Sequence, residues 1–471
     1  MTVAPGIIAR LKEAAGPKGF TEDPQEIAPH LSEWRSKYHG HTPLMLKPAS
    51  TEEVSRILAI CNETHTPIVP QGGNTGLVGG QIPIGGEVLL SLSRMNQIRD
   101  LDAEGMSITA EAGVILAQLK RAAEDAGRYF PLSLASEGSC TIGGNLSTNA
   151  GGVDVLRYGN ARELVLGLEV VLADGRVLDL LRTLRKDNTG YDLKQLFIGA
   201  EGTLGVITAA ALKLFPLPKE RATAFAAVPD VGSAIKLLAM MQDTTGGLIS
   251  AFELVPRIGL DLVLAHIPQT SDPLTAPSPW YVLIEATSGA GGTLATVFAD
   301  ALGQAISTGL ASDAVIASSE AQRSQLWRLR ESLSEAQKLE GASIKHDISV
   351  PIAEIPRFLD QGIAAVSRLI PGARPVPFGH LGDGNIHFNF NAPRGGDEGA
   401  FLARWDEVNR AVHDIVLHFE GSISAEHGVG VLKRAEIART KSATEIEIMR
   451  ALKRTLDPHN ILNPGKVVTA S

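Results

Sequence analysis

Residues 70–80, Pro-Gln-Gly-Gly-Asn-Thr-Gly-Leu-Val-Gly-Gly, contain five glycines and follow a short apolar run. Glycine tolerates positive φ, so backbone N–H groups in such a stretch can converge on an anion. Similar clusters occur at 136–152, Ser-Glu-Gly-Ser-Cys-Thr-Ile-Gly-Gly-Asn-Leu-Ser-Thr-Asn-Ala-Gly-Gly, and at 199–205, Gly-Ala-Glu-Gly-Thr-Leu-Gly. Their spacing matches neither the Rossmann fingerprint nor the P-loop. Each cluster alone is typical of tight turns in a glycine-rich β domain, whereas the three together favour a long phosphate-bearing cofactor.

The pattern along the chain predicts an α+β protein with two domains. β-rich runs at 88–92, 164–172 and 205–214 alternate with glycine-rich turns, and from about residue 222 strands alternate with helices. Glycines return at 424–430. We therefore expect a first domain over 1–218 that begins with short helices, a second over 219–421, and a segment over 422–471 that returns to the first.

A helix after residue 50 is predicted by its first turn and by its apolar spacing. Glu53 follows Ser50 by three residues, which is the capping-box pattern. Helical spacing then puts four apolar residues on one stripe: Val54, Ile57, Leu58 and Cys61.

Composition excludes several classes of protein. The 471 residues include 43 Lys and Arg against 52 Asp and Glu, a formal net charge of −9, and no basic block occurs. A nucleic-acid duplex or an anionic membrane surface is therefore not the expected main partner. No apolar window is long enough for a membrane span, and the start lacks a secretory signal. Two cysteines cannot form a disulfide framework. We expect a cytoplasmic protein, or a mitochondrial matrix protein if the source is eukaryotic, although no transit peptide is seen.

Two sequence segments carry candidate metal ligands. His380 and His387 flank Leu-Gly-Asp-Gly-Asn-Ile, which predicts a strand, a tight turn and a second strand. A separation of seven would place them on opposite faces of a straight strand, but a hairpin can bring them together. Glu426 and His427 lie in a glycine-rich loop. Two imidazoles and a carboxylate suit a catalytic metal such as Zn²⁺, with Mn²⁺ or Fe²⁺ as alternatives. The competing interpretation is a pair of structural histidines and a solvated acid.

A pocket for a carboxylate is predicted from two cationic segments. Arg330 and Ser334 are four apart, which would place them on one helical face. Alternation predicts that Lys345, Asp347 and Ser349 share one strand face. Arg suits a carboxylate through its planar fork and Lys adds a point charge. The competing interpretation of each is an ordinary surface cation.

Four motifs, at 70–80, 134–152, 159–175 and 198–208, resemble the D-2-hydroxyglutarate dehydrogenases, a family within the vanillyl-alcohol oxidase and para-cresol methylhydroxylase superfamily of flavoproteins. The resemblance runs over nearly the whole chain. It implies a vanillyl-alcohol-oxidase-type FAD-binding domain, an α+β substrate or cap domain that carries the metal-binding histidines, and a C-terminal helical segment that returns to the flavin. Some superfamily members attach the flavin through a histidine of the first loop. Asn74 follows Gly72 and Gly73 here, so we expect non-covalent FAD.

The same resemblance implies a set of FAD contacts in the first domain and near the C-terminus. They are Pro70, Gly72, Gly73, Asn74, Thr75, Gly76, Leu77, Gly138, Thr141, Gly144, Ser147, Asn149, Gly151, Gly152, Glu201, Gly202, Ile207 and Asn463.

The resemblance also assigns roles to the candidate metal and substrate residues. It implies that His380, His387 and Glu426 are the metal ligands, that His427 is the catalytic base, and that Asn389 helps to orient the substrate. It places the substrate-anchoring groups at Arg330, Ser334 and Lys345, with Ser334 standing where the family has Thr. D-Lactate dehydrogenases of the superfamily generally lack the Lys, so Lys345 favours a dicarboxylate.

The resulting hypothesis is an FAD- and metal-dependent dehydrogenase that oxidises D-2-hydroxyglutarate to 2-oxoglutarate. The metal would lower the alcohol's pKa, His427 would take the hydroxyl proton, and a hydride would pass to the flavin. D-Malate, D-lactate and glycolate remain alternative substrates on the same architecture. A zinc hydrolase and a non-catalytic flavin-binding module are the rivals from other classes. The expected partners are the hydroxy acid and an electron acceptor, either an electron-transfer flavoprotein or a quinone-linked carrier, and a homodimer is the candidate assembly.

Overall fold

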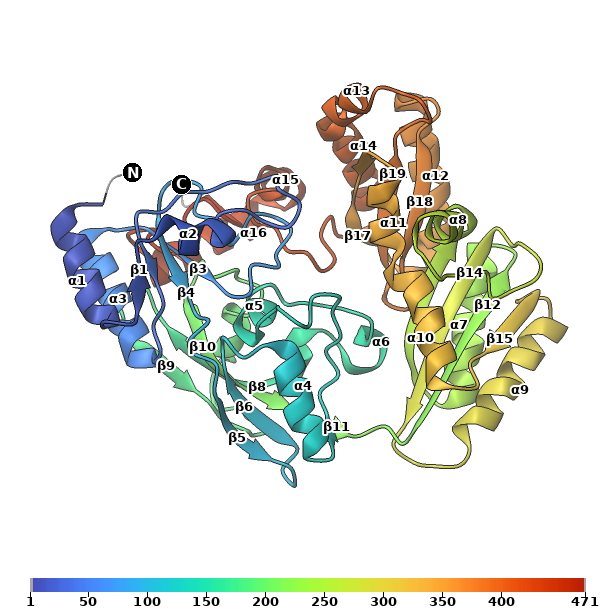
Figure 1. Ribbon diagram of the computed structural model, residues 1–471, viewed down its shortest axis with the longest axis horizontal. Coiled ribbons are helices and arrows are strands. Elements are labelled where there is room, and N and C mark those ends of the chain that lie inside the picture. The colour runs from blue at the N-terminus through green and yellow to red at the C-terminus, as the bar shows by residue number, and fades with distance from the viewer. Residues whose placement is uncertain (1–2, 470–471) are drawn as a thin grey trace. The chain divides into compact units, whose positions relative to one another are not determined.

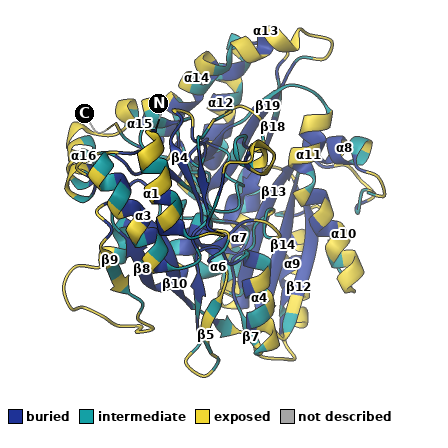
Figure 2. Ribbon diagram, turned by 60° about the vertical axis from the view of Figure 1, so that its left-hand side comes forward, coloured by how far each residue is buried: buried dark blue, intermediate teal, exposed yellow. Residues whose placement is uncertain are grey.

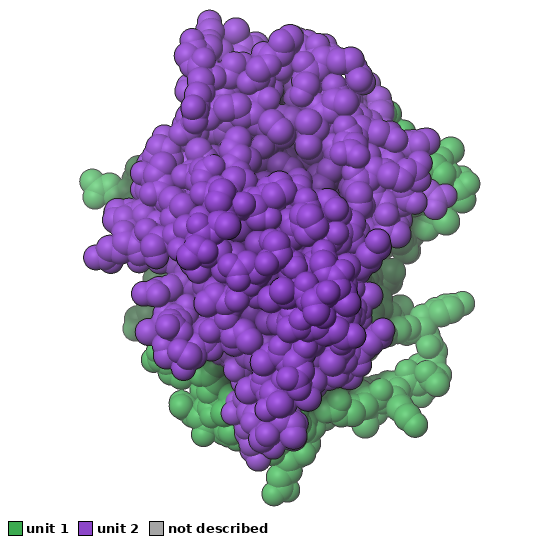
Figure 3. Space-filling view, turned by 90° about the vertical axis from the view of Figure 1, so that its right-hand side faces the viewer, with its two compact units in different colours: residues 1–152, 159–217, 426–471 green, residues 153–158, 218–425 purple. Residues whose placement is uncertain are grey.

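The computed structural model describes residues 3–469, and the chain divides into two compact units (Figure 3). Unit 1 comprises residues 1–152, 159–217 and 426–471, and unit 2 comprises 153–158 and 218–425. The chain passes from unit 1 to unit 2 at 217/218 and back at 425/426, near the expected boundaries at 218 and 421. The short segment 153–158, which the sequence pattern does not separate from the first domain, belongs to unit 2.

Unit 1 begins with a small sheet, and residues of helices α1 (Pro5–Ala15) and α3 (Thr51–Thr64) pack against one of its faces. Four strands lie in the order β1-β2-β4-β3. Ser50 caps the helix α3 by accepting from the backbone N–H of Glu53. The Glu53 carboxylate accepts from the N–H of Ala49 rather than from that of Ser50, so the predicted capping box is only half formed. The predicted apolar stripe is confirmed, since all four of its residues are fully buried: Val54, Ile57, Leu58 and Cys61.

The second sheet of unit 1 is five-stranded and antiparallel, and β7 and β11 form a separate pair. The five strands lie in the order β5-β6-β10-β8-β9. The predicted strands at 164–172 and 205–214 are β8 (Val165–Val171) and β10 (Val206–Lys213), which pair with each other. Both strands are almost entirely buried, which explains their continuous apolar sequence.

The remaining strands of unit 1 are β1 (Phe20–Thr21), β2 (Met45–Leu46), β3 (Ile68–Gln71), β4 (Val88–Ser91), β5 (Ile98–Asp102), β6 (Ser107–Glu111), β7 (Arg128–Tyr129), β9 (Val177–Leu180) and β11 (Phe215–Pro216). Its other α-helices are α1 (Pro5–Ala15), α2 (Pro24–Ile27), α4 (Leu116–Asp125), α5 (Ile142–Ser147), α15 (Arg434–Thr440) and α16 (Ala443–Leu456).

Unit 2 is built on one eight-stranded sheet. Its order is β15-β12-β14-β13-β18-β19-β16, and β17 also pairs with β19. The strands are β12 (Glu220–Val228), β13 (Ile249–Pro256), β14 (Trp280–Ser288), β15 (Asp313–Ile316), β16 (Ser343–Ile344), β17 (Asp347–Ser349), β18 (Arg374–His380) and β19 (Asn385–Asn391). The helices are α6 (Val155–Tyr158), α7 (Val231–Thr245), α8 (Arg257–His266), α9 (Leu294–Ser307), α10 (Glu320–Glu331), α11 (Leu333–Leu339), α12 (Ile355–Leu369), α13 (Glu398–Ala403) and α14 (Trp405–His418).

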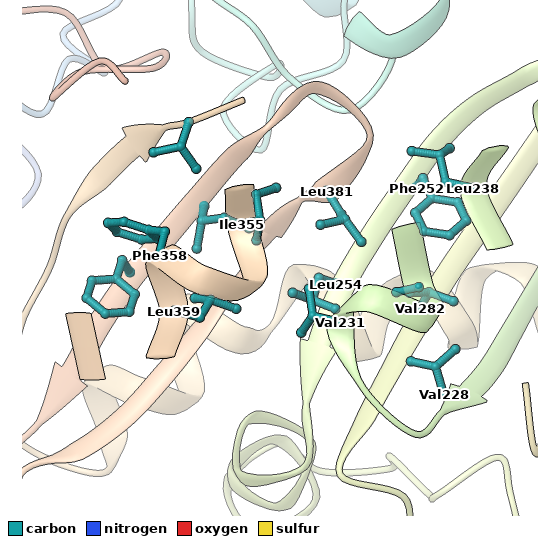
Figure 4. Close-up of a cluster of buried hydrophobic side chains, with 14 of the residues drawn as sticks. Val228, Val231, Leu238, Phe252, Leu254, Val282, Ile355, Phe358, Leu359 and Leu381 are labelled. Atoms are coloured by element: carbon teal, nitrogen blue, oxygen red, sulfur yellow. The ribbon is translucent and has the colours of Figure 1, made fainter. Parts of the chain in front are cut away.

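Helices cover both faces of this sheet, so its central strands are buried on both sides (Figures 1 and 2). On one face, Phe252 and Leu254 of β13 join the apolar cluster of α7, α9 and α12 (Figure 4). On the other face, Ala251 and Val255 of β13 join a second cluster with α8, α10 and α11. Because side chains alternate along a strand, Glu253 points to this second face.

No helix within residues 3–469 combines the length and the apolar character needed to cross a membrane.

Candidate active site

The first two glycine clusters pack directly against each other in unit 1. A Cβ added at Gly72 would lie 2.4 Å from the Thr141 Oγ1 atom. A Cβ added at Gly73 would lie 2.0 Å from the carbonyl oxygen of Ser139. Both are far below van der Waals contact, so only glycine permits this approach of the two loops. The clusters at 70–80 and 136–152 therefore form one continuous structure rather than two separate turns.

Three buried side-chain oxygens of unit 1 lack a hydrogen-bond partner among the described residues. One is Asn62 Oδ1, and the other two belong to predicted flavin contacts: Thr141 Oγ1, beside the Gly72 loop, and Asn463 Oδ1. The amide nitrogen of Asn463 donates to the carbonyl oxygens of Gly80 and Glu201, at 2.9 and 2.7 Å. Buried polar atoms in proteins are nearly always paired. A hydrogen-bonding ligand at each of these two predicted contacts would satisfy its unpaired oxygen.

The third glycine cluster is tied to the C-terminal segment through Glu201. This residue is buried, has a φ of +51°, and its two carboxylate oxygens accept from the backbone N–H groups of Val429 and Gly430 at 2.7 and 2.8 Å. Burial raises the pKa of Glu201, and the two N–H groups oppose that shift. The sequence motif did not indicate this function for the side chain, which holds the loop that follows Glu426 and His427.

All of the predicted flavin contacts lie in unit 1, and several of their side chains have partners within it. The Asn74 amide nitrogen donates to the carbonyl oxygens of Pro29 and Ser32, at 3.1 and 3.0 Å. Ser147 Oγ donates to the carbonyl oxygen of Gly143, and Asn149 Oδ1 accepts from the N–H of Arg162. These side chains hold the loops in shape. We therefore expect the loops to contact a cofactor through backbone groups.

The predicted hairpin in unit 2 is present and brings two histidines together. Strand β18 ends at His380, a 3₁₀ turn covers Leu381–Asp383, and Gly384 adopts a φ of +86° before β19 begins. His387 pairs with Phe378, which shares a strand face with His380. The His380 and His387 ring centroids are therefore only 5.6 Å apart.

A buried carboxylate that the sequence analysis missed joins His380 to Arg330. Glu253 of β13 lies opposite His380 of β18, and its Oε1 atom is 2.8 Å from His380 Nδ1. Its Oε2 atom accepts from Arg330 Nε at 2.8 Å and lies 2.7 Å from Nη2. Burial opposes ionisation of Glu253, but the charges and hydrogen bonds of its two partners lower its pKa overall. The only sequence signal is one acidic residue within the apolar run 249–256.

Arg330 is the penultimate residue of α10, and its guanidinium carbon lies 5.0 Å from the ring centroid of Phe378. The continuous helix predicted through Arg330 and Ser334 is interrupted. Helix α10 ends at Glu331 and α11 begins at Leu333, with Ser332 between them in a right-handed helical conformation, and Leu333 lies against Gly259 of α8. Ser334 therefore belongs to a different helix from Arg330, and their shared face stays a prediction.

The prediction of one strand through Lys345 is also wrong. Strand β16 ends at Ile344 and β17 begins at Asp347, so Lys345 and His346 lie in a gap between two strands that both pair with β19. Asn389 of β19 stabilises that gap. Its Oδ1 atom accepts from the N–H of His346 at 3.1 Å, and its Nδ2 atom donates to Gln337 at 2.9 Å.

Glu426 and His427 lie in unit 1 at the start of its C-terminal segment. Glu426 Oε2 accepts from the backbone N–H of Gly152 at 3.1 Å, and Glu426 Oε1 lies 3.9 Å from His427 Nε2. Gly152 is itself a predicted flavin contact, with a φ of +102°. The structure thus joins the second glycine cluster to the predicted ligand and base.

Comparison with known proteins identifies the family. Residues 42–181 match a family model described as an FAD binding domain, and residues 217–467 match the C-terminal domain of FAD linked oxidases. The mitochondrial D-2-hydroxyglutarate dehydrogenase of Arabidopsis thaliana is 42% identical over 98% of this chain and 82% of its own length. The D-2-hydroxyglutarate dehydrogenase of Xanthomonas citri pv. viticola is 38% identical over 98% and 96%. The chain belongs to the D-2-hydroxyglutarate dehydrogenase family.

Solved structures confirm the expected fold of this D-2-hydroxyglutarate dehydrogenase family member. A p-cresol methylhydroxylase matches with a TM-score of 0.76 and 16% identity, over 99% of this chain and 98% of its own. The 4-ethylphenol oxidase from Gulosibacter chungangensis matches with a TM-score of 0.75 and 18% identity, over 98% and 96%. The predicted fold class, a vanillyl-alcohol-oxidase-type FAD-binding domain with an α+β cap domain, is confirmed.

Membership of the D-2-hydroxyglutarate dehydrogenase family makes this chain an FAD-dependent hydroxy-acid dehydrogenase. The geometry of unit 1 fits FAD, because two loops meet where only glycine is tolerated, and because two predicted flavin contacts, Thr141 and Asn463, have buried oxygens without a partner among the described residues. The resemblance inferred from the motifs is therefore confirmed, and the rival hypotheses of a hydrolase and a passive module are excluded.

Proposed function

We propose that this enzyme oxidises D-2-hydroxyglutarate to 2-oxoglutarate, with FAD bound non-covalently and with a divalent metal ion. The names of its relatives support the substrate. One observation of the cap unit carries the proposal. A single carboxylate, Glu253, holds both a candidate metal ligand, His380, and a candidate anchor for the substrate carboxylate, Arg330. Those two functions are what a metal-assisted hydroxy-acid dehydrogenase has to combine.

The metal would have His380, His387 and Glu426 as its protein ligands. Two imidazoles and one carboxylate suit Zn²⁺ first, and Mn²⁺ or Fe²⁺ also accept such a set. The closeness of the two imidazole rings supports this assignment. When bound, the ion would supply a Lewis acid for the substrate hydroxyl, and FAD would supply the hydride acceptor.

The chain's own residues would bind the substrate and move its proton. His427 is the proposed base for the C2 hydroxyl proton, a role that requires a neutral imidazole. Arg330 would hold the carboxylate next to the hydroxyl, and Lys345 would hold the distal carboxylate, with Ser334 beside them. Asn389 would contact the substrate directly. Its side-chain oxygen also accepts from the backbone N–H of His346, the residue after Lys345, and would thereby help to position Lys345. A chain of net charge −9 needs such local cations to capture a dianion.

The reduced flavin must pass its electrons on. We propose an electron-transfer flavoprotein or a quinone-linked carrier as the acceptor, and a homodimer as the assembly. We also propose that the enzyme works in a reducing, cytoplasmic compartment, which its two free and buried cysteines, Cys61 and Cys140, support.

The test is anaerobic reduction of the bound flavin by a panel of hydroxy acids. The absorbance of the oxidised flavin should be bleached fastest by D-2-hydroxyglutarate, compared with D-malate, D-lactate and glycolate. Removal of metal by a chelator, or His380→Ala, should stop this reduction while the flavin stays bound. A chelated enzyme with full turnover would contradict the metal role, and faster bleaching by D-lactate or glycolate would contradict the substrate.

A further inference from the structure

The carboxylate of Glu253 connects two side chains that the proposed function uses for different purposes. It is fully enclosed between β13, β18 and α10, and its two oxygens divide their hydrogen bonds between His380 and Arg330. We propose that Glu253 is a positioning residue that selects the metal-binding tautomer of His380 and fixes the guanidinium of Arg330. This inference rests on the proposed function, because it takes His380 as a metal ligand.

The tautomer of His380 follows from the donors around Glu253. Arg330 remains charged and can only donate, and it directs both Nε and Nη2 to Oε2. The carboxylate between a charged guanidinium and an imidazole is an acceptor, so Nδ1 of His380 has to donate its proton to Oε1. A neutral imidazole carries one N–H. Its Nε2 atom therefore keeps the lone pair that a metal ion requires.

The same carboxylate limits how Arg330 can turn. Two of its donors, on the edge formed by Nε and Nη2, are directed to Glu253, and Phe378 lies against the guanidinium. The opposite edge, at Nη1, has no hydrogen bond to Glu253. Glu253 therefore leaves that edge as the one with which Arg330 can bind a substrate carboxylate.

A second buried carboxylate in the same sheet shows what distinguishes Glu253. Glu285 of β14 lies opposite Ala251, two residues from Glu253, and accepts from Arg323 and Trp327 of α10. Arg323, Trp327 and Arg330 follow the i, i+4, i+7 spacing, so one face of α10 reaches both carboxylates. Within residues 3–469 the carboxylate of Glu285 contacts no histidine; its partners are Thr223, Arg221, Arg323 and Trp327. Glu285 thus matches Glu253 in burial and arginine pairing but does not contact a candidate metal ligand.

The isosteric change Glu253→Gln should invert the tautomer of His380. Arg330 can only donate, so the amide oxygen must face it, and the amide NH₂ group must then face His380 Nδ1. That nitrogen becomes the acceptor, which moves the imidazole proton to Nε2 and blocks metal binding there. Loss of an outer partner of this kind typically weakens metal affinity by about 10–100-fold.

The experiment measures zinc release from the FAD-loaded holoenzyme by titration with a chelator of known affinity. Glu253→Gln should release half of its zinc at a chelator concentration about 10–100-fold lower than the parent requires, while both proteins keep their flavin absorbance. Glu285→Gln is the matched control, because it also breaks a buried arginine pair, and it should hold zinc as the parent does. Equal zinc affinity in Glu253→Gln and the parent would overturn the proposal.

A second measurement needs no substitution at Glu253. In parent holoenzyme labelled with ¹⁵N-histidine, the His380 signals are identified by their absence in His380→Ala, and long-range ¹H–¹⁵N couplings report which ring nitrogen carries the proton. After removal of zinc we expect a proton on Nδ1, and a proton on Nε2 alone would overturn the proposal even if Glu253→Gln fails to fold. If the parent instead holds no metal and ignores chelators, the metal role of the proposed function fails, and the tautomer still decides the role of Glu253.

Discussion

Gly73→Ala should release the flavin, whereas Gly138→Ala, at a second predicted flavin contact, should not. A Cβ at Gly73 would lie 2.0 Å from the Ser139 carbonyl oxygen and 3.0 Å from the Cα of Cys140, whereas ordinary contact begins at 3.4 Å. The two loops would have to separate by about 1.4 Å at that oxygen, and both contacts are backbone, so no side chain can rotate away. A Cβ at Gly138 would meet nothing within 4 Å.

The size of the effect follows from the hydrogen bonds that such a separation breaks. Hydrogen bonds occupy a window of only about 0.5 Å in donor–acceptor distance. Each one to a charged group contributes ~1.5–3 kcal/mol. The loss of a single bond to the pyrophosphate would therefore raise the FAD dissociation constant by roughly 10–150-fold.

The assay is serial dilution of the holoenzyme, with the fluorescence of released flavin as the readout. Circular dichroism of each variant checks that the fold is intact. Gly73→Ala should release FAD at much higher protein concentration than the parent, and Gly138→Ala at the parental concentration. If the folded Gly73→Ala protein binds FAD as the parent does, the meeting point of the two glycine clusters is not the flavin site.

Three further substitutions test the base, the distal cation and the buried sheet carboxylate. His427→Ala should slow flavin reduction in stopped flow by ~10²–10⁴-fold, and reduction at the parental rate would remove it from the mechanism. Lys345→Ala should lower kcat/KM for D-2-hydroxyglutarate at least roughly tenfold but leave D-2-hydroxybutyrate much less affected, and equal losses would argue against a dicarboxylate substrate. Glu285→Gln should destabilise the protein by ~1.5–3 kcal/mol at neutral pH, because it removes the charge that pairs with Arg323, which keeps only Glu320. Burial opposes ionisation of Glu285, but Arg323 keeps the pKa of Glu285 below its usual value. The difference in stability between the parent and Glu285→Gln should therefore shrink as pH falls below about 4. A difference in thermal unfolding that stays constant with pH would contradict this.

Local patterns were sufficient to predict many elements and the presence of an FAD-binding domain. The strands β8 and β10 and the helix α3 lie where the apolar pattern predicts them. Periodicity is a property of neighbours in the chain, so it survives folding wherever one face is buried. It failed where packing interrupts an element. Helix α10 ends at Glu331, and the chain continues as the separate helix α11. The predicted strand is interrupted at Lys345 and His346, where the side chain of Asn389 accepts from the backbone N–H of His346.

The amino-acid sequence alone was enough to identify the family and the flavin and to predict the two-histidine hairpin, because glycine clusters and a hairpin are contiguous motifs. It contained no comparable signal for Glu253, which is 127 residues from His380 in the chain. Only the antiparallel pairing of β13 with β18 sets these two residues opposite each other, and only the packing of α10 on that sheet brings Arg330 to the same carboxylate. A lone acid in an apolar strand is unfavourable until tertiary structure supplies both partners. Its role is therefore a property of the folded unit and is absent from any local segment.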